Sequence, residues 1–99
     1  MKVYVVRCEE GCYSDVSVVN EGVFATREAA ERHVRSHSAT FTLLSDGTTA
    51  EYYQFEDYDD AIGTVTRSPE ERGDGCWRIV GDPRYGAPDW FIEEWEVVA

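Results

Sequence analysis

Runs of β-branched and aromatic residues, separated by polar turns, predict six strands along the chain. Gly, Asp, Ser and Pro gather between these runs, as they do at turns. Asp46 and Gly47 lie between two of the runs and form a strong hairpin signal. A shorter run over 62–66 is a further candidate strand, and residues 68–75 are predicted to form a loop. The six predicted strands are residues 2–7, 16–24, 40–45, 48–55, 76–80 and 90–98.

Residues 26–37 have the period of an amphipathic helix. Thr26 is a good N-cap, and Glu28 suits the first turn that follows it. Spacings of three and four residues place one set of side chains on a common face, which is expected to pack on the sheet. That set is Ala29, Ala30, His33, Val34 and His37.

The order strand, strand, helix, then mostly strands predicts an α+β fold. We expect an antiparallel sheet of about five to six strands, a β-β-α start, and helix 26–37 packed on one face. The length of 99 residues predicts a single domain over 1–99. In the last strand the apolar pattern changes phase around Glu93 and Glu94, which predicts a bulge at that point.

Two cysteines followed by two histidines give the ligand order of a zinc site. Cys8 and Cys12 lie in the turn-rich segment 8–15, and His33 and His37 are four residues apart on the predicted helix. A helix that follows a hairpin runs back toward the hairpin loop, so the two pairs are expected to meet. Four protein ligands make one structural zinc and leave no position for a reactive water. Alternatively, the histidines are ordinary helix-end residues and the cysteines small loop residues.

Residues 4–37 resemble the ββα unit of a C2H2 zinc finger. Phe24, Ala30, His33 and His37 follow the spacing of that family: aromatic, five residues, core residue, two residues, His, three residues, His. Ala30 stands where the family prefers Leu. The 20 residues between Cys12 and His33 exceed the family's gap of about 12, so a longer hairpin is required. The resemblance implies a bound zinc ion, whereas reading of DNA does not carry over to so acidic a chain.

The charge balance excludes several classes of partner. Twenty acidic residues against nine basic ones give a net charge of −11. Such a surface repels nucleic acid and anionic membranes, so we expect a protein partner with a basic surface and no direct nucleic-acid or membrane binding. No stretch approaches the roughly 18 apolar residues of a membrane span, and the N-terminus is too short for a signal sequence. A cytoplasmic protein is expected, located in the host cytoplasm if a phage encodes it.

An acidic, aromatic segment lies in the middle of the chain, where no basic residue occurs between Arg35 and Arg67. Carboxylates interleaved with aromatic rings can imitate phosphates and stacked bases toward a basic groove. Alternatively, these acids keep a solvated strand edge from aggregating. The predicted partner-binding residues are Glu51, Tyr52, Glu56, Asp57, Tyr58, Asp59 and Asp60.

The whole chain resembles in type the small acidic proteins of phages and mobile elements, such as anti-CRISPR inhibitors. This resemblance implies an inhibitor that occupies a basic nucleic-acid-binding surface of a defence or regulatory complex by mimicry. The alternative is a small structural or regulatory domain that a metal ion stabilises, from a salt-adapted organism, acidic for solubility. The sequence has no Gly-x-Ser-x-Gly motif and no phosphate-binding glycine loop, so we do not expect an enzyme.

Overall fold

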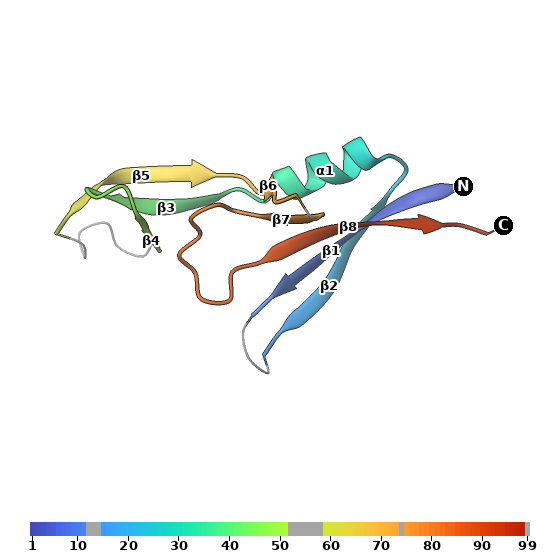
Figure 1. Ribbon diagram of the computed structural model, residues 1–99, viewed down its shortest axis with the longest axis horizontal. Coiled ribbons are helices and arrows are strands. Elements are labelled where there is room, and N and C mark those ends of the chain that lie inside the picture. The colour runs from blue at the N-terminus through green and yellow to red at the C-terminus, as the bar shows by residue number, and fades with distance from the viewer. Residues whose placement is uncertain (12–14, 52–58, 74, 99) are drawn as a thin grey trace.

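The computed structural model describes residues 1–11, 15–51, 59–73 and 75–98, and it has the predicted α+β fold with a β-β-α start (Figure 1). Antiparallel strands and one helix make up the described regions. They are β1 (Lys2–Glu10), β2 (Ser17–Phe24), α1 (Arg27–Arg35), β3 (Ala39–Leu44), β4 (Thr49–Glu51), β5 (Ala61–Arg67), β6 (Glu70–Glu71), β7 (Cys76–Arg78) and β8 (Asp89–Glu96).

Most of the strands form a five-stranded antiparallel sheet in the order β2-β1-β8-β7-β6. β1 lies between β2, the next strand in sequence, and β8, the last strand in sequence. Opposite Cys8 of β1 lie Val19 of β2 and Trp90 of β8. Residues directly opposite one another share a face, so these three side chains lie on the same side of the sheet.

This five-stranded sheet confirms the predicted antiparallel sheet of about five to six strands, but the strands predicted over 40–45 and 48–55 lie in a second sheet, in the order β4-β3-β5. After α1 the chain pairs locally: β3 forms the predicted hairpin with β4 through Asp46 and Gly47, and β5 pairs on the other edge of β3. This sheet extends beyond the helix-covered body and gives the molecule extents of 59 × 30 × 21 Å (Figure 1). Part of the predicted loop 68–75 also forms a strand, the two-residue β6.

The predicted bulge at Glu93 and Glu94 is also absent from the described strands. β8 pairs with β1 without interruption from Glu96 to Asp89. The irregularity lies instead in β2, where Val6 of β1 faces Gly22 and the next residue, Arg7, faces Asn20. Glu21 is therefore the extra residue of a bulge, which bends an edge strand and re-aims its side chain.

α1 covers one face of the five-stranded sheet, as predicted. Thr26 caps it, with Thr26 Oγ1 accepting the backbone N–H of Ala29 at 3.1 Å, and Ser36 forms its C-cap. The helix buries Ala30 and Val34 completely. In the described part of the chain, no helix has the length and apolar character needed to cross a membrane.

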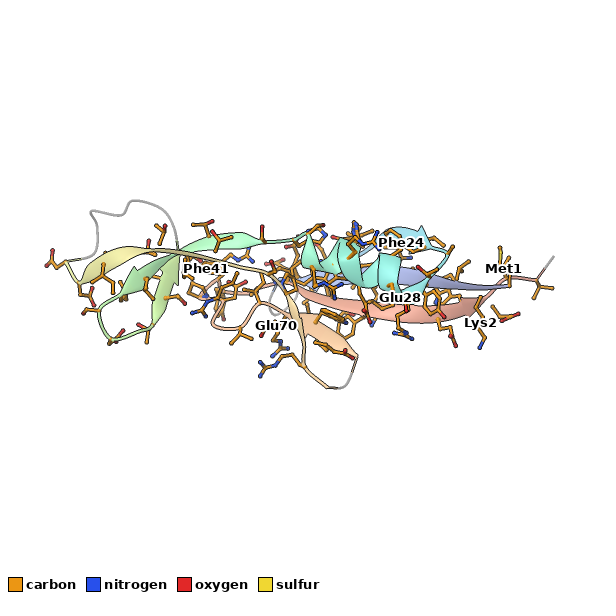
Figure 2. The ribbon with its side chains drawn as sticks, turned by 90° about the horizontal axis from the view of Figure 1, so that it is seen from above. Met1, Lys2, Phe24, Glu28, Phe41 and Glu70 are labelled. Atoms are coloured by element: carbon orange, nitrogen blue, oxygen red, sulfur yellow. The ribbon has the colours of Figure 1, made fainter. Side chains whose placement is uncertain are left out.

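A single hydrophobic core joins the helix and both sheets. Val6 of β1, Val34 of α1 and Phe41 of β3 are almost fully buried in it, together with Trp77 and Trp90. Phe41 lies where the three-stranded sheet meets the body, whereas Met1 and Lys2 lie at the opposite end of the long axis (Figure 2). This core packing fixes the position of α1 on the sheet, and the side chains of Glu21, His33 and His37 lie together beside the end of the helix.

Candidate metal centre

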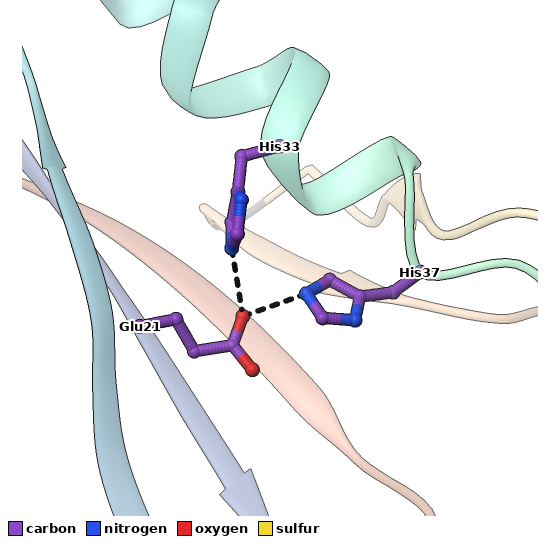
Figure 3. A group of neighbouring side chains, drawn as sticks. All are labelled: Glu21, His33 and His37. Atoms are coloured by element: carbon purple, nitrogen blue, oxygen red, sulfur yellow. Dashed lines mark hydrogen bonds and ion pairs between the residues drawn. The ribbon is translucent and has the colours of Figure 1, made fainter.

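Three potential metal ligands converge between β2 and the end of α1. The carboxylate of Glu21 and the imidazoles of His33 and His37 each offer one atom, and these atoms lie within 4.8 Å of one another (Figure 3). Glu21 Oε1 is 3.1 Å from His33 Nε2 and 2.8 Å from His37 Nε2. All three side chains are half-buried, so each remains in contact with the sheet and partly accessible.

The backbone places these side chains by different means. Glu21 is the extra residue of the bulge in β2, two residues from Val19, and its side chain points toward the end of the helix (Figure 3). His33 lies in the last turn of α1. His37 follows the C-cap residue Ser36, and its backbone N–H donates to Val34 O at 3.1 Å, which holds the turn after the helix. Spacing by four residues brings both imidazoles to the same side.

Ring contacts hold both imidazoles in place. Phe24 and His33 have ring centroids 5.2 Å apart, His33 and His37 meet edge to face at 5.1 Å, and His37 stacks on buried Trp90 at 5.1 Å. The Phe24 ring crosses over Gly22, where a Cβ would lie 3.0 Å from it. The row from Phe24 to Trp90 thus restricts the rotation of both ligand side chains.

The geometry of the cluster is compatible with a bound metal ion as well as with ion pairs. His33 Nε2 has hydrogen-bonding geometry toward Glu21, but the buried Nε2 of His37 has no hydrogen-bond partner, although the carboxylate is close. Such an arrangement is expected when nitrogen and oxygen point to a shared third position. A tetrahedral ion with bonds of about 2.0–2.1 Å keeps its ligand atoms about 3.3 Å apart. The separations of Glu21 Oε1 from the two Nε2 atoms, 3.1 and 2.8 Å, are somewhat shorter than this.

Cys8 lies beside this cluster, in strand β1 and not in the turn-rich loop expected from the sequence. It is buried in the same hydrophobic core as Ala30 and Val34 of α1, on the helix-facing side of the sheet. Burial, with the nearby carboxylates of Glu21 and Glu10, raises the pKa of this thiol to about 11. A pocket of about 280 Å³ adjoins the site; its lining includes Cys8, Glu10, Glu21, His37 and Trp90.

The structure brings together two of the four residues that the sequence predicted as zinc ligands. His33 and His37 come together as expected, and Cys8 lies near them, whereas Cys12 falls outside the described residues. Glu21 lies with the two histidines as a third potential ligand, which the sequence pattern did not indicate. The available signal was an acidic residue followed by Gly22 inside a β-branched run, a combination typical of a bulge.

The predicted acidic partner-binding segment is described only at its ends. Glu51 is half-buried at the end of β4, and Asp59 and Asp60 are exposed before β5. Tyr52, Glu56, Asp57 and Tyr58 lie outside the described residues. Most basic side chains elsewhere are paired with carboxylates of the same chain. These pairs are Lys2–Glu94, Arg7–Glu93, Arg35–Glu31, Arg78–Asp89 and Arg84–Asp82.

Comparison with known proteins assigns a family but no activity. No curated protein and no solved structure shows a significant match to the chain. A family model described as a domain of unknown function, DUF7336, matches residues 1–66. The matched region runs from β1 into β5 and contains Cys8, Glu21, His33 and His37. The chain belongs to the DUF7336 family.

Proposed function

We propose that this protein is a small metal-binding domain in which Zn²⁺ links strand β2 to the end of helix α1. The observation that carries the proposal is the convergence of Glu21, His33 and His37, whose ligand atoms lie within 4.8 Å of one another. Imidazole nitrogens and a carboxylate oxygen are common zinc ligands, and a d¹⁰ ion accepts the geometry that the protein offers.

A metal ion at this position has a clear structural use. α1 has nine residues, fewer than the roughly 12–15 at which an isolated helix becomes even marginally stable in water. Its last turn carries His33, and β2 is an edge strand held on one side only. An ion bound to Glu21 and both histidines joins these two elements directly, so part of its binding free energy becomes folding free energy.

Zinc binding is tested on the purified chain. We expect about one zinc per chain by elemental analysis. Zinc at about 100 times its dissociation constant stabilises a protein by about 2.7 kcal/mol. In a domain of this size that raises the melting temperature by about 10 °C or more, and a chelator reverses the rise. His37→Ala should abolish the zinc-dependent rise.

Arg32→Ala is the matched control, since it removes an exposed basic side chain from the same last turn of α1. This variant should retain both the zinc content and the zinc-dependent rise in melting temperature. A melting temperature that does not respond to zinc or to chelator, in a chain that purifies without metal, contradicts the proposal.

A second candidate function is the recognition of a basic protein surface. The net charge of −11 supports it, as does the pairing of Lys2, Arg7, Arg35, Arg78 and Arg84 with carboxylates of the same chain. With those basic groups neutralised locally, exposed acids such as Asp59 and Asp60 are available to a basic groove. In this proposal the protein acts as an inhibitor that mimics nucleic acid, and the metal ion stabilises its fold.

A further inference from the structure

The three ligands of the proposed site leave its class open. Zinc sites with three protein ligands and a water are typically catalytic, whereas structural sites have four protein ligands. The pocket beside Glu21 and His37 holds the candidates for a fourth position. Two potential ligands other than those already assigned line it, Cys8 and Glu10.

Cys8 is the better placed of the two. Its side chain is 8% exposed, it lies opposite buried Trp90 in the register, and it lines the pocket together with Glu21 and His37. Glu10, two residues along the same strand, is exposed to solvent. A thiolate is also a stronger zinc ligand than a carboxylate. Cys8 is not among the atoms that lie within 4.8 Å of one another, so its sulfur must approach the ion when the site closes.

The charges of the site favour a thiolate once an ion is present. With Zn²⁺ bound, the thiol loses its proton to solvent and a sulfur–zinc bond replaces the S–H bond. The ion, the thiolate and the Glu21 carboxylate then sum to zero charge, which lowers the cost of holding them in a half-buried position.

We propose that Cys8 is the fourth protein ligand and that it closes the centre as a Cys–Glu–His–His site. This inference rests on the proposed metal-binding function and makes it more specific. It assigns the site to the structural class, because four protein ligands leave no position for a reactive water. The proposed ligand set differs from the set expected from the sequence at one position, because Glu21 replaces Cys12.

Cobalt(II) provides the test, because a thiolate bound to this ion gives a charge-transfer band in the near ultraviolet. Titration of the metal-free full chain with Co²⁺ should produce this band together with the intense visible bands of a tetrahedral ion. Cys8→Ser should remove the charge-transfer band and weaken zinc binding by about tenfold or more. Circular dichroism of each variant verifies that it folds.

Two other cysteine variants are the controls. Cys76→Ser changes a buried cysteine of β7 and should keep the band, because residue 76 does not line the pocket. Cys12→Ser should also keep it. Cobalt that binds without a charge-transfer band, or a band that depends on Cys12 and not on Cys8, overturns the assignment of Cys8. Failure of the chain to bind either metal contradicts the proposed function itself.

A second measurement keeps the proposal testable if Cys8→Ser fails to fold. The wild-type chain is treated with an alkylating reagent, with and without zinc, and the labelled peptides are identified by mass spectrometry. Bound zinc should slow the labelling of Cys8 at a pH near 9 by tenfold or more, and it should leave the labelling of Cys76 unchanged. Equal labelling rates of Cys8 with and without zinc overturn the proposal.

Discussion

At the scale of single residues, Glu21 determines how the two histidines are used. Its Oε1 is close to both Nε2 atoms, and in the proposed metal site it is the ligand between them. Glu21→Gln keeps the size and one acceptor oxygen but removes the negative charge. We expect a modest effect on the metal-free chain and a loss of zinc affinity of about 10–100-fold or more, since even outer-shell partners of a ligand contribute that much.

The measurement is calorimetric titration with zinc, alongside chemical unfolding in chelator. Glu10→Gln is the control, because it removes the same charge from the same pocket at a position that is not assigned as a ligand. If both variants lose zinc affinity equally, the effect is one of general charge and Glu21 is not a ligand. If Glu21→Gln destabilises the metal-free chain as much as the zinc-bound one, the carboxylate serves as an ion-pair partner only.

The sequence could reveal only part of this site. His33 and His37 were predictable because a four-residue spacing on a helix has one geometric outcome. Glu21 was not, because it is the residue without a partner between Asn20 and Gly22, and alternation alone does not locate such a bulge. Its position depends on the register between β1 and β2, which no local pattern specifies.

At the scale of elements, helix α1 depends on its N-cap because it is short. Thr26 Oγ1 accepts the backbone N–H of Ala29 and satisfies one of the four N–H groups that lack partners at the start of a helix. Thr26→Ala should lower the free energy of unfolding by about 1 kcal/mol, measured by denaturant titration in chelator. Thr26→Ser keeps the acceptor and should cost only a fraction of this. Equal losses from the two variants would show that the methyl group and not the cap is responsible.

Local signals were sufficient for elements whose causes are local. The cap at Thr26 and the turn at Asp46 and Gly47 depend on residues that are close in sequence, and both were predicted. The division into two sheets was not. β1 pairs with β8, at the other end of the chain, while β3 pairs with its neighbours β4 and β5. The choice among such partners depends on packing in the shared core, around Phe41 and Trp90, and alternation alone does not determine it.

At the scale of the whole molecule, the charge has to be considered together with the shape. A net charge of −11 on a body with extents of 59 × 30 × 21 Å opposes compaction by self-repulsion and attracts basic partners. Asp59 and Asp60 are turn residues directly before β5, an edge strand of the three-stranded sheet that extends beyond the helix-covered body (Figure 1). Glu70 and Glu71 form β6 in the other sheet, so the two acidic pairs occupy different regions of the molecule.

These two pairs allow a matched test of the acidic surface. Asp59→Asn with Asp60→Asn and Glu70→Gln with Glu71→Gln each remove two exposed negative charges. If the acidic segment binds a basic groove, only the first double variant should weaken partner binding several-fold. Binding should fall as salt rises, since the Debye length shortens from about 10 Å at 0.1 M to 3 Å at 1 M. Retention of the partner on the immobilised protein across a salt series, with duplex DNA as competitor, measures both effects.

Equal weakening by the two double variants would mean that net charge and not this segment directs binding. Binding that is insensitive to salt and to DNA contradicts the mimicry proposal. The salt-adapted alternative makes a different prediction for the isolated chain: unfolding at low salt and recovery in molar salt, with no requirement for a partner. Melting temperatures measured across the same salt series separate the two explanations. The measurements use protein saturated with zinc, so that the stability that the proposed site contributes does not vary while salt screens the surface charges.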